Sequence, residues 1–203
     1  MSRTEIETAH GIARAELHCV PEGRAALLLG HGAGGGISAP DLVAATRGAQ
    51  AAGLHVALVE QPYRVAGRRA PAPAAQLDTA WLTVADALSG EWFDDVPLVF
   101  GGRSSGARVA CRTAGDGQAV AVVCLAFPLH PPGKPEKSRA GELDGVEVPT
   151  LVVQGENDPF GRPEGAHHRE IVLLKGDHSL KSDAKGVART VEEWLGRILR
   201  PLD

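Results

Sequence analysis

The stretch Pro97-Leu-Val-Phe-Gly-Gly-Arg-Ser-Ser-Gly-Ala-Arg-Val-Ala110 runs from an apolar strand, through a glycine-rich turn, into a helix-forming segment. Its centre, Gly102-Arg-Ser104-Ser-Gly106, has the Gly-x-Ser-x-Gly spacing of a nucleophile elbow. In such a turn, side chains at the two glycine positions would collide, and the middle serine is exposed at the carboxyl end of the strand. The stretch therefore predicts an α/β protein with Ser104 as a nucleophile. The alternative is a tight turn in which the Ser104 hydroxyl only caps the helix.

Outward from this turn, strands and helices alternate. Six short apolar runs are typical of strands buried on both faces: residues 25–29, 56–59, 98–100, 120–126, 150–153 and 171–174. The helical candidates are 41–52 closed by Gly53, 74–88 closed by Gly90, 104–113, and 187–199 stopped by Pro201. This order predicts a mostly parallel sheet of six core strands with helices on both faces. Residues 5–20 alternate loosely, so we expect one or two additional edge strands there.

Composition sets limits on the class of protein. With 203 residues, 43% hydrophobic content and a net charge of −4, we expect one globular domain over residues 1–203, without a separate cap. The near-neutral charge balance argues against a nucleic-acid partner. Residues 1–8 lack an apolar signal core and no apolar run has membrane-spanning length, which favours a cytoplasmic protein with no membrane contact. The sequence says nothing of a protein partner.

The cysteines do not indicate chemistry. Cys19, Cys111 and Cys124 are odd in number and lack a C-x-x-C spacing, so we expect free thiols and neither a metal nor a cofactor.

A glycine-rich loop follows the first core strand. Gly30-His-Gly-Ala-Gly-Gly-Gly36 is small enough for backbone amides to approach a substrate carbonyl. Acyl transfer needs two donors aimed at the developing oxyanion, one of them from the residue after the nucleophile. We assign the amides of Ser105 and Ala33, with Gly32 as the substitute, and expect His31 to hold this loop by hydrogen bonding.

A serine nucleophile also needs a base and an acid. Asp158 follows the strand at 150–153 and precedes Pro159, which fixes the loop; Glu156 is its rival. Among eight histidines, only His178 falls between the last core strand and the last helix. Ser104, Asp158 and His178 stand in the chain order of the α/β-hydrolase triad.

At this point the chain resembles an α/β-hydrolase, and within that superfamily a small dienelactone-hydrolase-like group related to the hydrolase-like domain of a chromatin-complex subunit (non-specific lethal complex). The shared motifs are His31-Gly-Ala-Gly34, Pro62-Tyr-Arg64, Gly102-Arg-Ser104, Pro128-Leu-His-Pro-Pro-Gly-Lys-Pro135, Gln154-Gly155 with Asp158-Pro-Phe-Gly161, and Gly176-Asp-His-Ser-Leu180. The resemblance implies an α/β-hydrolase fold with Ser104, Asp158 and His178 as nucleophile, acid and base. Dienelactone hydrolases proper carry a cysteine nucleophile, and the serine found here counts against dienelactones as the substrate.

Basic residues give a clue to the substrate. Arg103, beside the nucleophile, and Arg64 are candidate substrate-binding residues together with His31. Loops expected at the same rim carry more positive charge, although the whole chain is acidic. The sequence thus predicts a serine esterase for a small acyl ester or thioester that carries a carboxylate or phosphate. The alternative is that these loop charges are simply solvated.

Two other functions are open. Gly30-x-Gly32-x-x-Gly35, with Glu60 at the end of the next strand, also matches a dinucleotide-binding fingerprint. That hypothesis leaves Ser104, Asp158 and His178 unexplained. The second alternative is a non-catalytic interaction protein that keeps the hydrolase fold.

Overall fold

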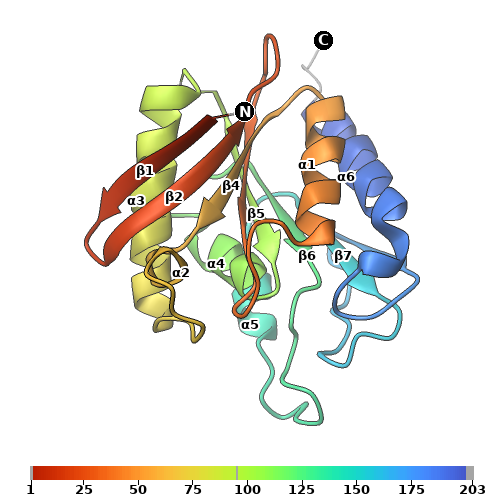
Figure 1. Ribbon diagram of the computed structural model, residues 1–203. Helices are drawn as coiled ribbons and strands as arrows, with labels where there is room; N and C mark the ends of the chain where they lie inside the picture. The colour runs from red at the N-terminus through yellow and green to blue at the C-terminus, as the bar shows by residue number, and fades with distance from the viewer. Residues whose placement is uncertain (1, 95, 200–203) are drawn as a thin grey trace.

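The computed structural model describes residues 2–94 and 96–199. One eight-stranded sheet runs through the molecule in the order β1-β2-β4-β3-β5-β6-β7-β8 (Figure 1). The strands are β1 Ser2–Thr8, β2 Gly11–His18, β3 Ala26–Gly30, β4 His55–Glu60, β5 Leu98–Arg103, β6 Ala121–Leu125, β7 Thr150–Gly155 and β8 Arg169–Leu174. The strands from β3 to β8 pair in parallel, and the hairpin β1–β2 joins β4 antiparallel. The prediction of six parallel core strands with N-terminal edge strands is confirmed.

Helices cover both faces of the sheet. They are α1 Pro40–Ala51, α2 Pro62–Val65, α3 Ala74–Trp92, α4 Ser105–Thr113, α5 Ala140–Asp144 and α6 Ala184–Ile198, with a short 3-10 helix η1 at Lys181–Asp183. Helices α1 and α6 lie side by side on one face, while α3 and α4 lie on the other (Figure 1). Within the described residues, no further layer covers the carboxyl ends of the strands, as expected for a hydrolase fold without a cap.

Two helix ends differ from expectation. Gly90 does not close α3, which continues to Trp92 because the following Phe93 packs into the core with 1% exposure. Helix α6 ends at Ile198, and the proposed stop at Pro201 lies outside the described residues. The short helices α2 and α5 lack the length at which a 3.6-residue period becomes visible in sequence.

The sheet divides the hydrophobic core in two. Trp81 of α3 meets Phe100 of β5 edge to face on one side, and Trp194 of α6 packs on the other. The central strands β3 and β6 are buried along their whole length, because helices cover them on both faces. This rigid centre fixes where the strands end, and the loops that leave those ends carry the predicted site residues.

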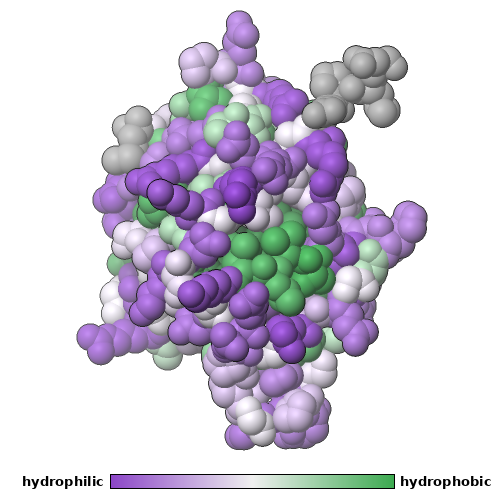
Figure 2. Space-filling model, turned by 90° about the vertical axis from the view of Figure 1, so that its right-hand side faces the viewer, coloured by the Kyte–Doolittle hydropathy of each residue, from purple (hydrophilic) through white to green (hydrophobic). Residues whose placement is uncertain are grey.

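The edge strand β8 is less covered. Leu173 is 44% exposed, and Ile171, Val172 and Leu174 are half-buried. Figure 2 views the side of the molecule that carries α1 and α6 and shows an apolar patch within a mostly polar surface.

Within the described residues, no helix has both the length and the apolar character required to cross a bilayer.

Candidate active site

Ser104 occupies a strained position between β5 and α4. Its backbone has φ 52° and ψ −109°, a left-handed conformation that L-residues rarely adopt. A β-carbon on Gly102 would lie 2.6 Å from the carbonyl carbon of Gly106 and 2.7 Å from the Gly30 oxygen. A β-carbon on Gly106 would collide with the Gly30 carbonyl. The predicted steric need for both glycines is confirmed, and the turn presents Ser104 at the end of β5.

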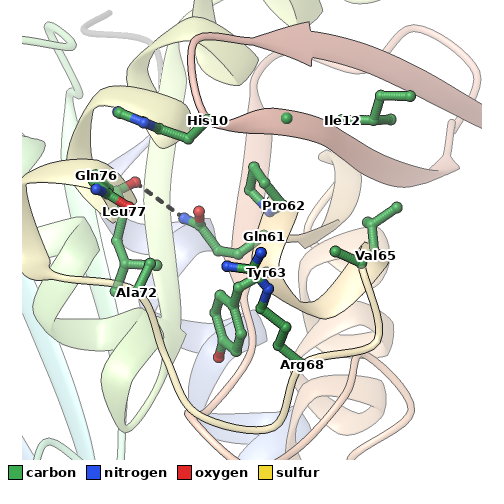
Figure 3. A pocket seen from close by; sticks show the side chains of 12 residues that line it. His10, Ile12, Gln61, Pro62, Tyr63, Val65, Arg68, Ala72, Gln76 and Leu77 are labelled. Atoms are coloured by element: carbon green, nitrogen blue, oxygen red, sulfur yellow. Dashed lines mark hydrogen bonds between the residues drawn. The ribbon is translucent and has the colours of Figure 1, made fainter.

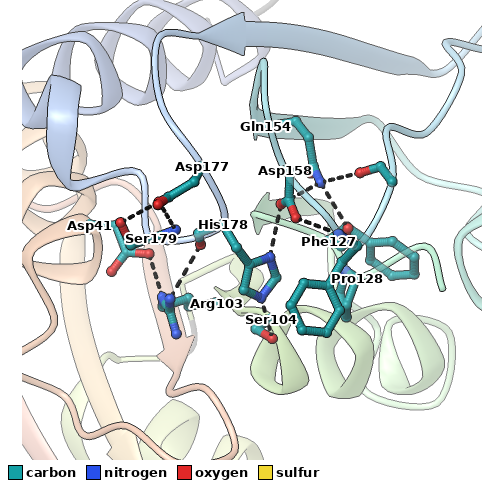
Figure 4. Close-up of polar contacts among 12 residues, drawn as sticks. Asp41, Arg103, Ser104, Phe127, Pro128, Gln154, Asp158, Asp177, His178 and Ser179 are labelled. Atoms are coloured by element: carbon teal, nitrogen blue, oxygen red, sulfur yellow. Dashed lines mark hydrogen bonds and ion pairs between the residues drawn. The ribbon is translucent and has the colours of Figure 1, made fainter. Parts of the chain in front are cut away.

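His178 contacts both other members of the predicted triad. Its Nε2 lies 2.9 Å from Ser104 Oγ, and its Nδ1 lies 2.8 Å from Asp158 Oδ2 (Figure 4). Because an ionised carboxylate can only accept, Nδ1 carries the proton and donates to Asp158, and Nε2 accepts from the Ser104 hydroxyl. The ring of Phe160 stacks on the imidazole, with centroids 4.1 Å apart. The fold thus brings together three residues that lie far apart in sequence.

The side chain of Asp158 is fully buried and held by several donors. Its Oδ1 accepts from the Phe160 amide at 2.8 Å, and its Oδ2 accepts from Gln154 Nε2 at 2.9 Å as well as from His178. The rival, Glu156, is exposed. Its position on the surface explains why Asp158, and not Glu156, reaches His178.

Gln154 belongs to one of the shared motifs, but its role in the site was not predicted from the sequence. This residue in β7 has 0% exposure, and its Nε2 also donates to the carbonyls of Phe127 (3.0 Å) and Gly161 (2.8 Å). With three oxygen acceptors around it, only the nitrogen of the carboxamide can face them. The signal in the sequence is a polar residue within the apolar run Leu151-Val-Val-Gln154.

Backbone carbonyls of the glycine-rich loop are held from inside the protein. His31 Nδ1 contacts the Gly32 carbonyl at 2.9 Å, while the Gln61 amide donates to His31 Nε2 at 3.1 Å. The Tyr63 hydroxyl donates to the Ala33 carbonyl at 2.9 Å. Burial lowers the pKa of His31, which fits the neutral ring that this pattern requires. Both ring nitrogens thus have partners in the protein, and substrate binding by His31 stays a prediction.

Two amides at this end of the sheet are available to a ligand. Among the described residues, neither the Ala33 nor the Ser105 N–H is donated to another group of the protein. Ser105 is the first residue of α4, where an unpaired N–H is expected at a helix start. Gly32 packs against Ser104, since a β-carbon on Gly32 would lie 3.6 Å from that of Ser104.

Arg103 has partners other than those predicted. Its Nε donates to Asp41 Oδ2 at 2.8 Å, and its Nη2 donates to the His178 carbonyl at 3.2 Å (Figure 4). Two of the three guanidinium nitrogens therefore have partners in the protein, and a direct contact of Arg103 with an anionic substrate stays a prediction. Asp41, whose side chain has 0% exposure, was not recognised from the sequence. Arg64 lies on α2 and donates to the Arg68 carbonyl at 3.3 Å; within the described residues it has no carboxylate partner.

A separate cavity of about 290 Å³ lies between the β1–β2 turn, α2 and the start of α3 (Figure 3). Pro62, Leu77 and Ile12 give it apolar walls, and Gln61 donates to the Leu77 carbonyl at 3.1 Å in its wall. Ser104, Asp158 and His178 do not line it.

The glycine loop does not have the geometry of a dinucleotide site. A pyrophosphate binds where a glycine turn opens directly into a helix, so that the helix N-terminus points at it. Here β3 ends at Gly30, and α1 begins only at Pro40, beyond the whole glycine run.

Comparison with known proteins agrees with the fold. Residues 23–200 match the family model of the alpha/beta hydrolase domain, and the chain belongs to this family. A Xanthomonas campestris protein described as an α/β serine hydrolase without a lid has a TM-score of 0.82 at 16% identity, covering 100% of this chain and 96% of that one. Dienelactone hydrolase from Anabaena variabilis has a TM-score of 0.76 at 18% identity, covering 98% of each chain.

A third similar structure is Est1E from Butyrivibrio proteoclasticus, with a TM-score of 0.76 at 16% identity, covering 96% of this chain and 98% of that one. No curated protein sequence matches the chain.

Proposed function

We propose that this protein is a serine hydrolase of the carboxylesterase type, which cleaves an ester or thioester through an acyl-enzyme on Ser104. One observation carries the proposal. His178 lies 2.9 Å from Ser104 Oγ and 2.8 Å from the buried Asp158 carboxylate. Because a carboxylate only accepts, these contacts favour the tautomer that base catalysis requires. A helix-capping hydroxyl would need no imidazole partner, and Ser104 makes no side-chain capping bond to α4.

The chemistry follows from these contacts. Ser104 Oγ attacks the substrate carbonyl as its proton passes to His178 Nε2, and Asp158 stabilises the imidazolium that forms. The amides of Ala33 and Ser105, with Gly32 as the substitute for Ala33, donate to the developing oxyanion. His178 then returns the proton to the leaving alcohol or thiol. Water repeats the sequence against the acyl-enzyme and releases the acid, so the reaction needs no cofactor.

The substrate class is a small acyl ester. No layer covers the strand ends within the described residues, so molecules of varied shape have access. Because two nitrogens of Arg103 already have partners in the protein, Arg64 is the first basic residue that we propose for an anionic group of the substrate. Transfer of the acyl group to an alcohol instead of water uses the same first step. Est1E, a structural neighbour, has also been solved with ferulic acid bound; a hydroxycinnamoyl ester is thus a reasonable first test substrate.

The test is covalent labelling. A fluorophosphonate should modify Ser104 of the wild-type protein, and mass spectrometry of the peptides should locate the adduct. Ser104→Ala and His178→Ala should abolish labelling. Ser105→Ala is the matched control, because it removes the neighbouring hydroxyl and keeps the backbone amide. Absence of labelling in the wild type would contradict the proposal and favour a non-catalytic interaction protein that keeps the hydrolase fold.

A further inference from the structure

Arg103 lies at the junction of three segments of the candidate site (Figure 4). Its Nε contacts Asp41 in the first turn of α1, and its Nη2 contacts the carbonyl of His178. Its Nη1 passes over Gly32, where a β-carbon would be 2.8 Å away. One side chain, on the residue next to the nucleophile, therefore touches the glycine-rich loop, α1 and the segment that carries the base.

We propose that Asp41 and Arg103 form a positioning pair for His178. Arg103 holds the His178 carbonyl and thereby keeps the imidazole within reach of Ser104. Asp41 supplies the negative charge that prevents the guanidinium from opposing the positive charge on the imidazole. Neither residue touches the reacting atoms. The inference rests on the proposed function, since positioning serves activity only where His178 accepts the Ser104 proton.

The electrostatic part of the proposal follows from Coulomb's law. When His178 accepts a proton it becomes a cation, and an uncompensated guanidinium at its own carbonyl would make that step harder. The Arg103 side chain is only 19% exposed, so water screens its charge incompletely. Asp41 cancels this charge at 2.8 Å. The groups around His178 are Ser104, Asp158, the ring of Phe160, the exposed Asp177 and Lys181 of its own segment, and the Asp41–Arg103 pair.

The burial of Asp41 argues against a role in stability alone. Desolvation raises the pKa of its carboxyl even though Arg103 and the Leu42 amide oppose this change. The folded protein therefore holds the ionised carboxylate at a cost in free energy at neutral pH. A buried ion pair is weak evidence for stability. The cost is understandable where the Asp41 charge compensates the guanidinium that holds the His178 carbonyl.

Opposite charge changes provide the decisive test. Asp41→Asn leaves the Arg103 cation uncompensated, and Arg103→Met leaves the Asp41 anion. Titration of the His178 ring, followed by NMR and assigned by the signal missing in His178→Ala, should move to lower pH in Asp41→Asn and to higher pH in Arg103→Met. The double variant should return towards the wild-type midpoint. A merely structural role would not move the two single variants in opposite directions.

Measurements of activity distinguish the effect of the Arg103 charge from the effect of its contact with the His178 carbonyl. For an ester substrate, we expect kcat/KM to fall about tenfold in Asp41→Asn and about tenfold to a hundredfold in Arg103→Met, through kcat and not KM. Arg103→Lys keeps the charge and should recover part of the loss. The double variant should stay slow, because it lacks the contact that holds the His178 carbonyl.

Asp78→Asn is the matched control. It disrupts the forked pair of Asp78 with Arg112, whose side chain is also 19% exposed, at a place away from His178. The proposal would be overturned if the His178 titration midpoints of Asp41→Asn and Arg103→Met moved in the same direction, or moved no further than in Asp78→Asn. Full activity in both single variants, with Ser104 labelled in the wild type, would overturn the positioning role alone. Failure of the wild type to label would instead contradict the proposed hydrolase, while the NMR comparison still decides whether the pair acts on the imidazole.

Discussion

Two groups of ion pairs lie on opposite faces of the sheet and differ in what surrounds them. On the α1 face, Arg103 pairs with a fully buried Asp41 at 2.8 Å. On the α4 face, Arg112 makes a fork with Asp78 of α3, at 2.6 and 2.8 Å, and also reaches Glu142 of α5 at 3.2 Å. The carboxylates on the α4 face keep 20–22% side-chain exposure, and that of Asp41 keeps none.

The protonation of the carboxylates shows what this difference means. Burial tends to raise the pKa of Glu142, but the hydrogen bonds and charges of Arg108 and Arg112 outweigh it and the pKa is lowered. For Asp41 burial prevails, and the pKa is raised. Glu142 therefore contributes stability as an anion, and Asp41 is ionised at a cost. Similar ion pairs can thus hold helices together on one face and position a base on the other.

The largest effect should come from the acid at the site. Asp158→Asn removes the acceptor that fixes the His178 tautomer, and kcat should fall by about 10³–10⁴. Thermal stability should fall modestly as well, because asparagine has one acceptor oxygen where Asp158 uses both of its oxygens to accept hydrogen bonds. The measurement is ester hydrolysis beside a melting curve. Glu156→Gln is the control and should keep wild-type kcat; the opposite result would assign the acid to Glu156.

Substitution of Gln154 should lower both activity and stability, because this residue belongs to the site and to the core. Gln154→Leu keeps the approximate volume, removes the side-chain donor of the Gly161 carbonyl, and leaves the Phe127 carbonyl with only the Leu129 amide. We expect a loss of about 2–3 kcal/mol in unfolding free energy and a fall in kcat as Asp158 loses one of its donors. Urea unfolding and ester hydrolysis measure the two losses. An unchanged unfolding free energy would show that the three contacts of Gln154 contribute nothing net.

Asp158 and Gln154 also show which parts of the site can be predicted from the sequence. Ser104, Asp158 and His178 could be predicted to lie together because each directly follows a strand of a parallel sheet, whose carboxyl ends share one edge. Gln154 and Asp41 could not. A glutamine within an apolar strand and an aspartate in a first helical turn have common structural explanations. The partners of Asp41 and Gln154, Arg103 and the Phe127 carbonyl, are fixed only by tertiary structure.

A substitution that disturbs helix packing on the α4 face should lower the stability of the protein but not its activity. Arg112→Met leaves Asp78 unpaired, and because the pair is partly exposed we expect a loss of about 2 kcal/mol. That corresponds to a Tm lower by about 4–8 °C for a chain of this size. At temperatures where the variant is folded, kcat/KM should stay within about twofold of wild type. A larger drop would mean that the two groups of charges are coupled through α4. Arg112→Lys should lose less stability than Arg112→Met, since it keeps one charge.

The smallest expected effects are changes in the free energy of unfolding, and they should have opposite signs on the two faces of the sheet. At neutral pH, Asp41→Asn should unfold at higher denaturant than wild type, because the substitution removes a carboxylate that is ionised at a cost. Glu142→Gln should unfold at lower denaturant, because it removes a carboxylate stabilised by Arg108 and Arg112. On acidification the Asp41→Asn advantage should disappear first, as Asp41 in the wild type protonates at its raised pKa. The Glu142→Gln deficit should persist until the pH falls below the carboxyl range of the unfolded chain, since a lowered pKa keeps Glu142 ionised in the folded state. Urea midpoints between about pH 7 and pH 3 measure both. If both variants shifted the midpoint with the same sign, the Asp41–Arg103 pair would be an ordinary stabilising contact, and the contrast between the faces would fail.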